Sequence, residues 1–382
     1  MSSTRLHRDR PTWMAYLATA GYIWGLYGMG PALLLLRDET DMSRTVASLH
    51  SSVMAIGFLL VGAVGAALTR TLGRRRTLDL GMLGSTIGVL LLAFGGTPAL
   101  SIPGALLMGF SGSIVLNTQS AFLALHHGDL GPSAMGEQNA AGGIAGLLAP
   151  LSLGLIATSA VNWRLALLVG PAAFVLVLLL RGRSADTTTG PQLAHQDGGR
   201  LPRTYWWAWA GLALCIAVEF SFIMWAGDVL RAQTGASVAL AAGGLTAVAA
   251  GIVIARTSIP ALLRRIGLEQ LFRLSLLVPA LAWIPMWLST SAAVVLVCMA
   301  VIGLGIGLHY PLGLARMVLR APGHADLAAN RSAFASGIAI GLAPLGLGAL
   351  ADGVGVHTAF ITIPALLLAA VATMRTDAST TA

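Results

Sequence analysis

A single acidic residue interrupts one of the most apolar stretches of the sequence, CIAVEFSFIMWAG at residues 215–227. Glu219 has no arginine within eleven residues on either side. A charged side chain at the middle of a bilayer costs about 2.5–3.5 kcal/mol on insertion scales, so an acid there needs a partner, water or a proton. Glu219 is therefore a candidate for carrying a proton or binding a cationic group. The alternatives are a structural hydrogen bond to a neighbouring helix and an exposed position near a helix end.

A second titratable group lies in GLGIGLHYPLGLAR, near residue 309. Histidine titrates near neutral pH, so His309 could relay protons with Glu219. Tyr310 follows it and can donate or accept a hydrogen bond. A structural hydrogen bond between His309 and a facing helix is the alternative.

Polar and aromatic side chains mark two further apolar stretches. In GFSGSIVLNTQS, Asn117 shares a helical face with Ser113 and Ser120, and its amide can both donate and accept. In GYIWGLYGMGP, Trp24 and Tyr27 are three residues apart, and their rings could stack on a solute or attract a cation. Polar contacts between helices and ordinary aromatic packing are the alternatives.

Motifs for enzymatic chemistry are absent from the sequence. It has no H-E-x-x-H, no G-x-S-x-G and no G-x-x-x-x-G-K-[ST], which argues against a membrane enzyme and against an ATP-driven pump. The two cysteines, Cys215 and Cys298, give neither a disulfide framework nor metal-ligand spacing. We expect no cofactor and no metal.

The composition is that of an integral membrane protein. Of 382 residues, 56% are hydrophobic and only 10% are charged, whereas soluble domains carry about 25% charged residues. All lysine-or-arginine positions are arginines, and they are spread along the chain, mostly between the apolar runs, rather than gathered in one patch. The net charge of +8 therefore does not indicate nucleic-acid binding.

Twelve apolar runs are long enough to cross a bilayer as helices, and the absence of strict period-2 alternation favours helices over a barrel. The runs are 13–36, 46–69, 77–97, 99–125, 136–158, 163–181, 206–230, 238–263, 270–289, 292–319, 332–351 and 357–374. With both termini in the cytoplasm, eighteen arginines lie inside and four outside, as the positive-inside rule favours. We expect a multi-pass protein of the inner cell membrane.

The two halves of the chain resemble each other. GIAGLLAPLSLGLIA at 143–157 and GIAIGLAPLGLGALA at 337–351 are identical at ten of fifteen positions, at an offset of 194. The same offset aligns Gly57 with Gly251 and Gly109 with Gly303. The sequence therefore predicts two six-helix bundles related by duplication, with an axis along the membrane normal and a cavity between them. We place the bundles at 1–181 and 206–382, joined by a cytoplasmic linker at 182–205.

At this point the whole chain resembles the major facilitator superfamily of transporters. The clearest motif is ALTRTLGRRRTL at 67–78, which matches the tail of the family's loop between spans two and three. Gly73, Arg74, Arg75 and Arg76 match, and the resemblance implies that they form a gating loop. Arg70 replaces the acid of the family's loop. The arginines could instead attract anionic lipid.

The fifth span resembles the family's exporter-associated motif, with Ala149, Pro150 and Gly154 at matching positions. Its copy around Pro344 matches equally well, so close helix packing is the alternative meaning. The fourth span lacks the arginine found in many proton-coupled drug exporters.

The resemblance implies alternating access around a cavity lined by spans one, four, seven and ten. It makes Trp24, Tyr27, Asn117 and Tyr310 candidates for binding substrate, and Glu219 and His309 candidates for proton coupling. We expect a proton-coupled exporter of a small neutral or cationic organic compound, working as a monomer in contact with membrane lipid. An importer by symport and a sensor that kept the fold are the alternatives.

Overall fold

The computed structural model describes residues 6–127, 130–181, 201–321 and 325–378, which are helical and contain no β-strand. The first half contains α1 (Arg10–Thr40), α2 (Arg44–Phe94), α3 (Pro98–His127), α4 (Gly131–Ala157), α5 (Arg164–Leu167) and α6 (Val169–Arg181). The second half contains α7 (Arg203–Thr234), α8 (Val238–Ala242), α9 (Leu245–Leu263), α10 (Leu268–Leu288), α11 (Ala292–Leu319), α12 (Ala325–Val354), α13 (Val356–Ala359) and α14 (Thr362–Ala378).

Twelve segments of the described helices are long and apolar enough to cross a bilayer. They coincide with the twelve predicted runs to within a few residues at most ends, so the all-helical, twelve-span prediction is confirmed. The predicted linker lies mostly outside the described residues, and α7 already begins at Arg203.

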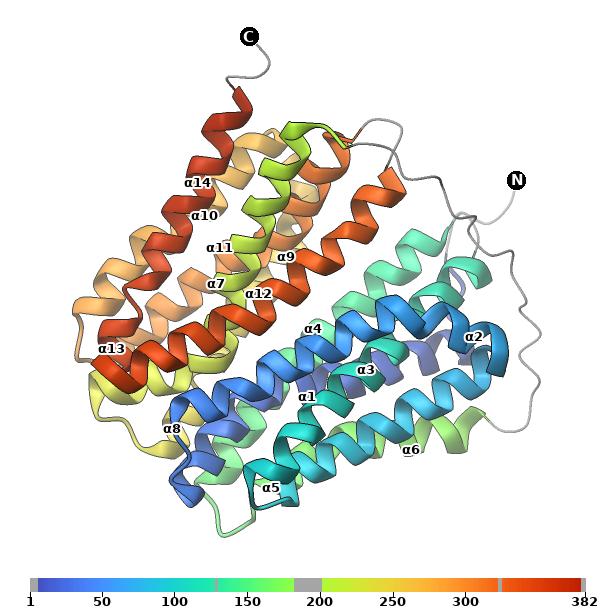
Figure 1. Cartoon of the computed structure of the whole chain (residues 1–382), viewed down its shortest axis with the longest axis horizontal. Coiled ribbons are helices and arrows are strands. Elements are labelled where there is room, and N and C mark those ends of the chain that lie inside the picture. Colours follow the sequence, from blue (N-terminus) through green and yellow to red (C-terminus); the bar gives the residue numbers. More distant parts are fainter. Residues whose placement is uncertain (1–5, 128–129, 182–200, 322–324, 379–382) are drawn as a thin grey trace.

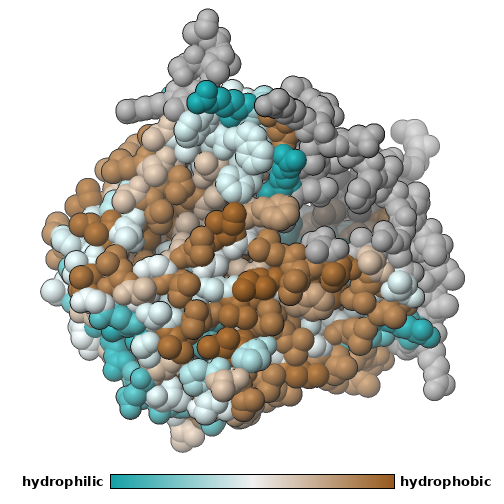
Figure 2. Space-filling model, in the orientation of Figure 1, coloured by the Kyte–Doolittle hydropathy of each residue, from teal (hydrophilic) through white to brown (hydrophobic). Residues whose placement is uncertain are grey.

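The outer surface of the helices is apolar. Leu179, Leu319 and Leu368 are each more than two thirds exposed. Figure 2 shows brown, apolar residues across the middle of the visible face and teal, hydrophilic residues toward its edges. An exposed apolar surface of this extent belongs in lipid rather than in water.

The two halves meet where α2 packs against α12 and α4 packs against α8 and α9, with α1 and α7 in contact at the centre. These two spans are the most deeply buried: 83% of the residues in the most apolar 18-residue window of α1 are buried, and 78% in that of α7. Each of them packs against its own half and against the other half. We call the side on which α1 begins and α14 ends the termini side. Figure 1 shows α2 and α12 close together toward the opposite side and farther apart toward the termini side.

A sharp bend at Gly73 separates two of the spans within α2. Its φ of 79° and ψ of 155° are not helical. A Cβ at Gly73 would meet nothing within 4 Å, so glycine is needed there for its backbone conformation and not for space. The glycine of the predicted gating loop therefore makes the turn between spans two and three.

Two pairs of glycines show the duplication as packing. A Cβ on Gly109 would lie 2.3 Å from the carbonyl oxygen of Met54, and one on Gly303 would lie 2.2 Å from that of Val248. Met54 and Val248 are themselves 194 residues apart, as are the two glycines. The crossing of α2 with α3 therefore recurs, contact for contact, as the crossing of α9 with α11.

We expect Gly109→Ala and Gly303→Ala to lower the thermal unfolding temperature of the purified protein by similar amounts, because each forces two helix backbones apart. Overpacking of this kind costs about 1–3 kcal/mol or more. Gly136→Ala is the matched control, since a Cβ there meets nothing within 4 Å. Equal unfolding temperatures for all three variants would contradict the assigned crossings.

Candidate functional site

Glu219 lies at the place where the two halves touch. Its carboxylate is 6% exposed, and one oxygen, Oε1, accepts both of its hydrogen bonds. The hydroxyl of Tyr27 on α1 donates at 3.3 Å, and Nη2 of Arg256 on α9 donates at 3.2 Å. No described residue donates to Oε2. The acid thus bonds across the interface through one oxygen and keeps the other available.

Arg256 is the partner that sequence reasoning missed. Its Nε donates to the carbonyl of Gly307 on α11 at 3.4 Å, and its side chain remains 37% exposed. Tyr310 is close enough to interact electrostatically with the Arg256 guanidinium. The signal was present in the sequence, because Arg256 is the one arginine that lies more than three residues inside a predicted span.

Small residues let Tyr27 reach Glu219. A Cβ on Gly30 would lie 2.0 Å from the carbonyl oxygen of Ile223, so α1 and α7 approach here at backbone distance. One turn away, the ring of Tyr27 lies 3.2 Å from the Cβ position of Gly146 on α4. Close helix contact through glycines is common in membrane proteins, and here it places the phenol against the acid.

His309 is fully buried within the second half. Its Nε2 lies 2.9 Å from the carbonyl oxygen of Ser275 on α10, and because that oxygen can only accept, Nε2 carries the proton. No hydrogen bond joins His309 to Glu219 among the described residues. The direct relay between the two therefore stays a prediction, and the alternative of a hydrogen bond to a facing helix is present.

The other candidates for binding substrate have different surroundings. Tyr310 is 37% exposed, and Asn117 is also exposed, without a hydrogen bond to the described residues. Trp24 points elsewhere, because its indole nitrogen donates to the carbonyl of Ala166 on α5 at 2.7 Å. The structure thus brings Tyr27 and Tyr310 near the Glu219–Arg256 pair and directs Trp24 into its own half.

Crossed ion pairs join the halves on the opposite side. Arg37 on α1 bonds Asp228 on α7 at 2.5 Å, and both side chains are largely buried. Arg231 on α7 bonds Asp38 on α1 in return, at a more exposed position. Arg37 and Arg231 are equivalent in the duplication and each pairs with an acid of the other half, although the two acids do not occupy equivalent positions.

A carboxylate from one half also caps a helix of the other. Asp352, near the end of α12, accepts hydrogen bonds from the backbone N–H groups of Arg44 and Thr45 at 3.0 and 2.8 Å. These groups open α2, whose first turn lacks internal acceptors and carries a partial positive charge. Opening this side would expose both the cap and the ion pairs to water.

The duplicated Ala-Pro segments pack at the same interface. Gly154 on α4 lies against Gly243 at the start of the α8–α9 span, where a Cβ would come within 2.8 Å of its Cα. Its equivalent, Gly348 on α12, lies against Ser48 of α2, where a Cβ would come within 2.1 Å of Oγ. Each segment therefore contacts the opposite half.

A sequence profile described as Major Facilitator Superfamily matches residues 15–329. The chain belongs to this superfamily.

Solved structures agree with that assignment at the level of the fold. A bacterial homologue of the human lysosomal transporter Spinster, inward-facing and occupied, matches 98% of this chain and 98% of its own with a TM-score of 0.74 and 14% identity. The nucleoside transporter NupG matches 96% of this chain and 99% of its own with a TM-score of 0.76 and 13% identity. No curated protein sequence matches the chain.

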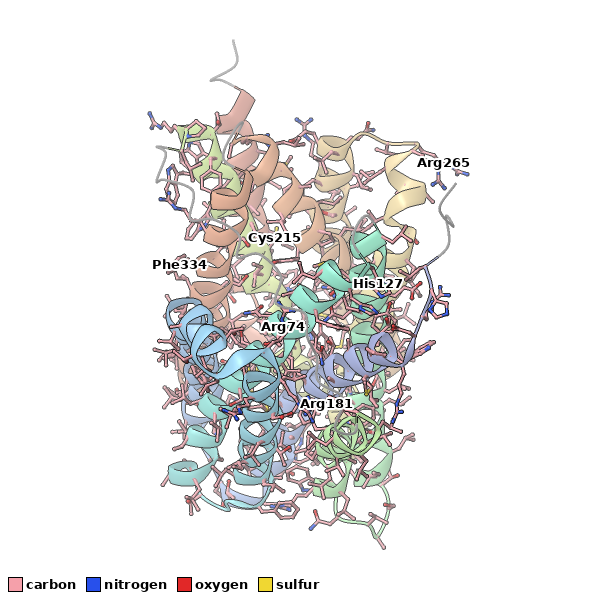
Figure 3. The ribbon with its side chains drawn as sticks, turned by 90° about the vertical axis from the view of Figure 1, so that its right-hand side faces the viewer. Arg74, His127, Arg181, Cys215, Arg265 and Phe334 are labelled. Carbon is pink, nitrogen blue, oxygen red and sulfur yellow. The ribbon has the colours of Figure 1, made fainter. Side chains whose placement is uncertain are left out.

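The superfamily's loop between spans two and three lies on the termini side. Arg74 and Arg75 are half-buried and line a small hollow together with Arg181 of α6, whereas Arg76 is exposed. Arg181 is 8% exposed and pairs with Asp79 of α2. Figure 3 labels Arg74 and Arg181 on the α2 and α6 ribbons. Arg181 therefore adds a buried cation beside the half-buried Arg74 and Arg75. Arg181 was not among the residues predicted for the gating loop.

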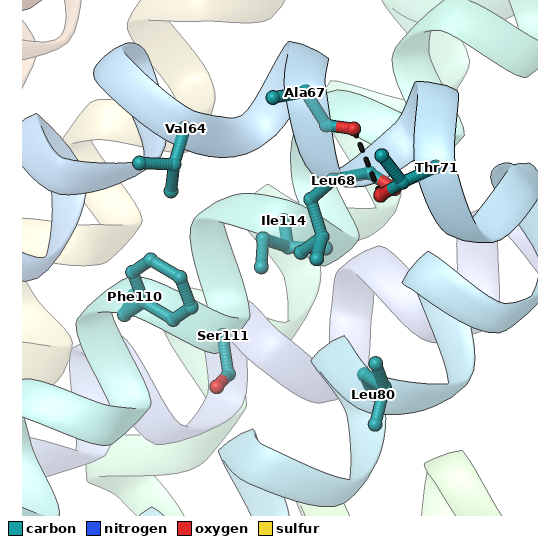
Figure 4. A pocket seen from close by; sticks show the side chains of 8 residues that line it. All are labelled: Val64, Ala67, Leu68, Thr71, Leu80, Phe110, Ser111 and Ile114. Carbon is teal, nitrogen blue, oxygen red and sulfur yellow. Dashed lines mark hydrogen bonds between the residues drawn. The ribbon is translucent and has the colours of Figure 1, made fainter.

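A larger cavity lies away from the acid. Figure 4 shows it between α2 and α3, with a volume of about 450 Å³. Its lining is mostly apolar and includes no ionisable side chain: Val64, Ala67, Leu68, Thr71, Leu80, Phe110, Ser111 and Ile114. Because this cavity holds no charged group, the buried Glu219–Arg256 pair between the two halves is the better candidate site.

Proposed function

We propose that the chain is a proton-coupled secondary transporter that exports a small organic compound by alternating access, with Glu219 as its proton-carrying group. One observation carries the proposal: an acid, its arginine and a tyrosine from the other half meet at the buried centre of a superfamily member. A structural ion pair would not need a tyrosine from the moving half.

Proton binding would act on the contact between halves. While Glu219 is ionised, the bonds from Tyr27 and Arg256 are charge-assisted, and such bonds are roughly twice as strong as neutral ones. A proton on Oε2 removes the charge, so both bonds weaken and α1 is held less tightly to α7. The opposite side, joined by Arg37–Asp228 and the second crossed ion pair, then opens more readily.

Antiport requires proton and substrate to use the site in turn. Oε2 of the ionised acid can accept a hydrogen bond from an N–H or O–H group of a substrate. A proton bound to Oε2 would prevent that hydrogen bond. Because Arg256 already balances the carboxylate, the substrate needs a donor but no full positive charge. We therefore place neutral compounds with donor groups first and cationic ones second. Tyr310 and Asn117 are the proposed further contacts, and His309 and Trp24 support the helices around them.

The state described here fits an inward-facing conformation. The halves are held together on the opposite side, and the matched Spinster homologue is itself described as inward-facing. The arginine distribution supports cytoplasmic termini, and therefore a cytoplasmic opening, in an inner cell membrane. The exporter-like Ala-Pro segment supports export, because its Gly154 packs at the interface that must open and close. We propose a working monomer.

The test is proton movement in vesicles that contain the purified protein and a pH-sensitive dye, with neutral, cationic and anionic compounds added in turn. We expect a neutral or cationic compound to move protons against its own direction. Proton movement in the same direction as the compound would show symport instead. Compounds that bind without any flux would show a sensor that kept the fold.

A further inference from the structure

Three ligand-type side chains gather on the termini side, far from Glu219 in the fold. Asp9 precedes the first turn of α1, and His126 and His127 end α3. The carboxylate oxygen of Asp9 and one ring nitrogen of each histidine all lie within 4.8 Å of one another. Figure 3 labels His127. The proposed transport mechanism uses none of the three.

Hydrogen bonds aim the two imidazole rings at one point. Nε2 of His126 lies 2.6 Å from Oδ2 of Asp9. The hydroxyl of Thr12 donates to Oδ1 of Asp9 at 2.5 Å, so it accepts from Nε2 of His127 at 2.8 Å. Both rings therefore present the same nitrogen toward the carboxylate.

The surroundings hold this arrangement in place. The ring of Phe122 stacks on His126 with centroids 4.9 Å apart, and the two histidine rings meet edge to face at 4.8 Å. Asp9 is fixed as the N-cap of α1, where it accepts from the backbone N–H of Thr12. Side chains of His126 and Asp9 are 29% and 30% exposed, so a solute can reach them.

The donor set suits a divalent transition metal. Two neutral imidazoles and one carboxylate are ligands that zinc prefers, with water completing a tetrahedron. An aspartate carboxylate accepts through either oxygen, so Asp9 can offer one oxygen to an ion while the other keeps its bond from Thr12. A single carboxylate is too few for calcium, which takes six to eight oxygen ligands.

We propose that Asp9, His126 and His127 bind one Zn²⁺ ion, which joins the first turn of α1 to the last turn of α3. Each ring would bind the ion through Nε2 in place of its present hydrogen bond and keep one proton on Nδ1, and any second proton on a ring would pass to water. The site lies within the first half, so it would stiffen that half without joining it to the second.

The test uses the full-length, tag-free protein in detergent. Isothermal titration with ZnCl₂ should show one ion per chain, and His126→Ala/His127→Ala should weaken binding by more than about 100-fold, since even outer-shell partners are worth 10–100-fold. His357→Ala is the control, because His357 stacks on Trp287 elsewhere in the fold. MgCl₂ should give no binding heat.

Co²⁺ in place of Zn²⁺ keeps the proposal testable if the double variant folds poorly. Four-coordinate Co²⁺ should add visible absorption bands to the wild type, and Asp9→Asn, His126→Gln and His127→Gln should each weaken them. Zinc binding that survives in all of these variants, or that is lost equally in His357→Ala, would overturn the site.

Discussion

Glu219→Gln is expected to reduce proton-coupled transport to the level of protein-free vesicles and to weaken substrate binding, because the amide NH₂ replaces the acceptor at Oε2. The amide keeps the shape of the side chain, and its oxygen can still accept from Tyr27 and Arg256 at the Oε1 position. It cannot take up a proton in the physiological range. Exchange of labelled for unlabelled compound needs no net proton movement, so it should persist when the compound is present at saturating concentration. The measurement is dye-reported proton flux beside exchange in the same vesicles.

The matched control is Glu39→Gln, the same substitution at an acid that pairs with Arg164 within the first half. It should couple like wild type. The Glu219 variant leaves Arg256 without its counter-charge. Because the arginine side chain is 37% exposed and partly screened by water, the loss of stability should be smaller than the about 3–5 kcal/mol of a fully buried pair. Glu219→Gln/Arg256→Gln should recover part of that stability but not the coupling. Normal coupling in either variant would remove Glu219 from the mechanism.

Gly30→Val is expected to keep the opposite side from closing and to abolish transport in a folded protein. A Cβ at this position would lie 2.0 Å from the carbonyl oxygen of Ile223, and a backbone atom cannot rotate away as a side chain can. The helices α1 and α7 must then separate, which also draws Tyr27 from Glu219. Spin labels at Ala160 and Thr290, in a chain without its two cysteines, should report longer distances between the halves.

Gly346→Val in α12 is the control, because a Cβ there meets nothing within 4 Å. It should keep the wild-type label distance and transport. If Gly30→Val transports as well as this control, the approach of α1 to α7 is not a contact on which the cycle depends.

The spans could be predicted from the sequence because a bilayer imposes one simple rule on composition and length. Each apolar run of about 20 residues became a helix, and the even number per half gave both halves the same direction. The duplication was visible too, because Gly57, Gly109, Gly251 and Gly303 occupy positions where any side chain would separate two backbones. Only glycine fits at these positions, so the two halves have glycines at the same offset of 194 residues.

The partner of Glu219 could not be read from spacing along the chain. Arg256 is 37 residues away on the next span, and only the packing of α7 against α9 brings the two side chains together. The absence of a nearby arginine along the sequence therefore does not leave the acid without a charged partner in the structure. Tyr27 was selected for its ring, yet its hydroxyl makes the contact that crosses between the halves.

Helical spacing also misplaced some side chains relative to one another. Trp24 and Tyr27 are three residues apart, but one donates to Ala166 in its own half and the other to Glu219 in the second half. The 3.6-residue repeat predicts which residues lie on the same face of a helix. It does not predict which neighbouring helix packs against that face.

The charged centre itself does not follow the duplication. At the offset of 194, the positions equivalent to Glu219 and Arg256 are Gly25 and Gly62. Both charges therefore belong to one half and move with it as a unit. The ionised pair is neutral overall, whereas the protonated pair carries one positive charge. Membrane voltage, worth about 2.3 kcal/mol per charge per 100 mV, would then act on the rocking step of the protonated carrier and leave that of the ionised carrier nearly untouched.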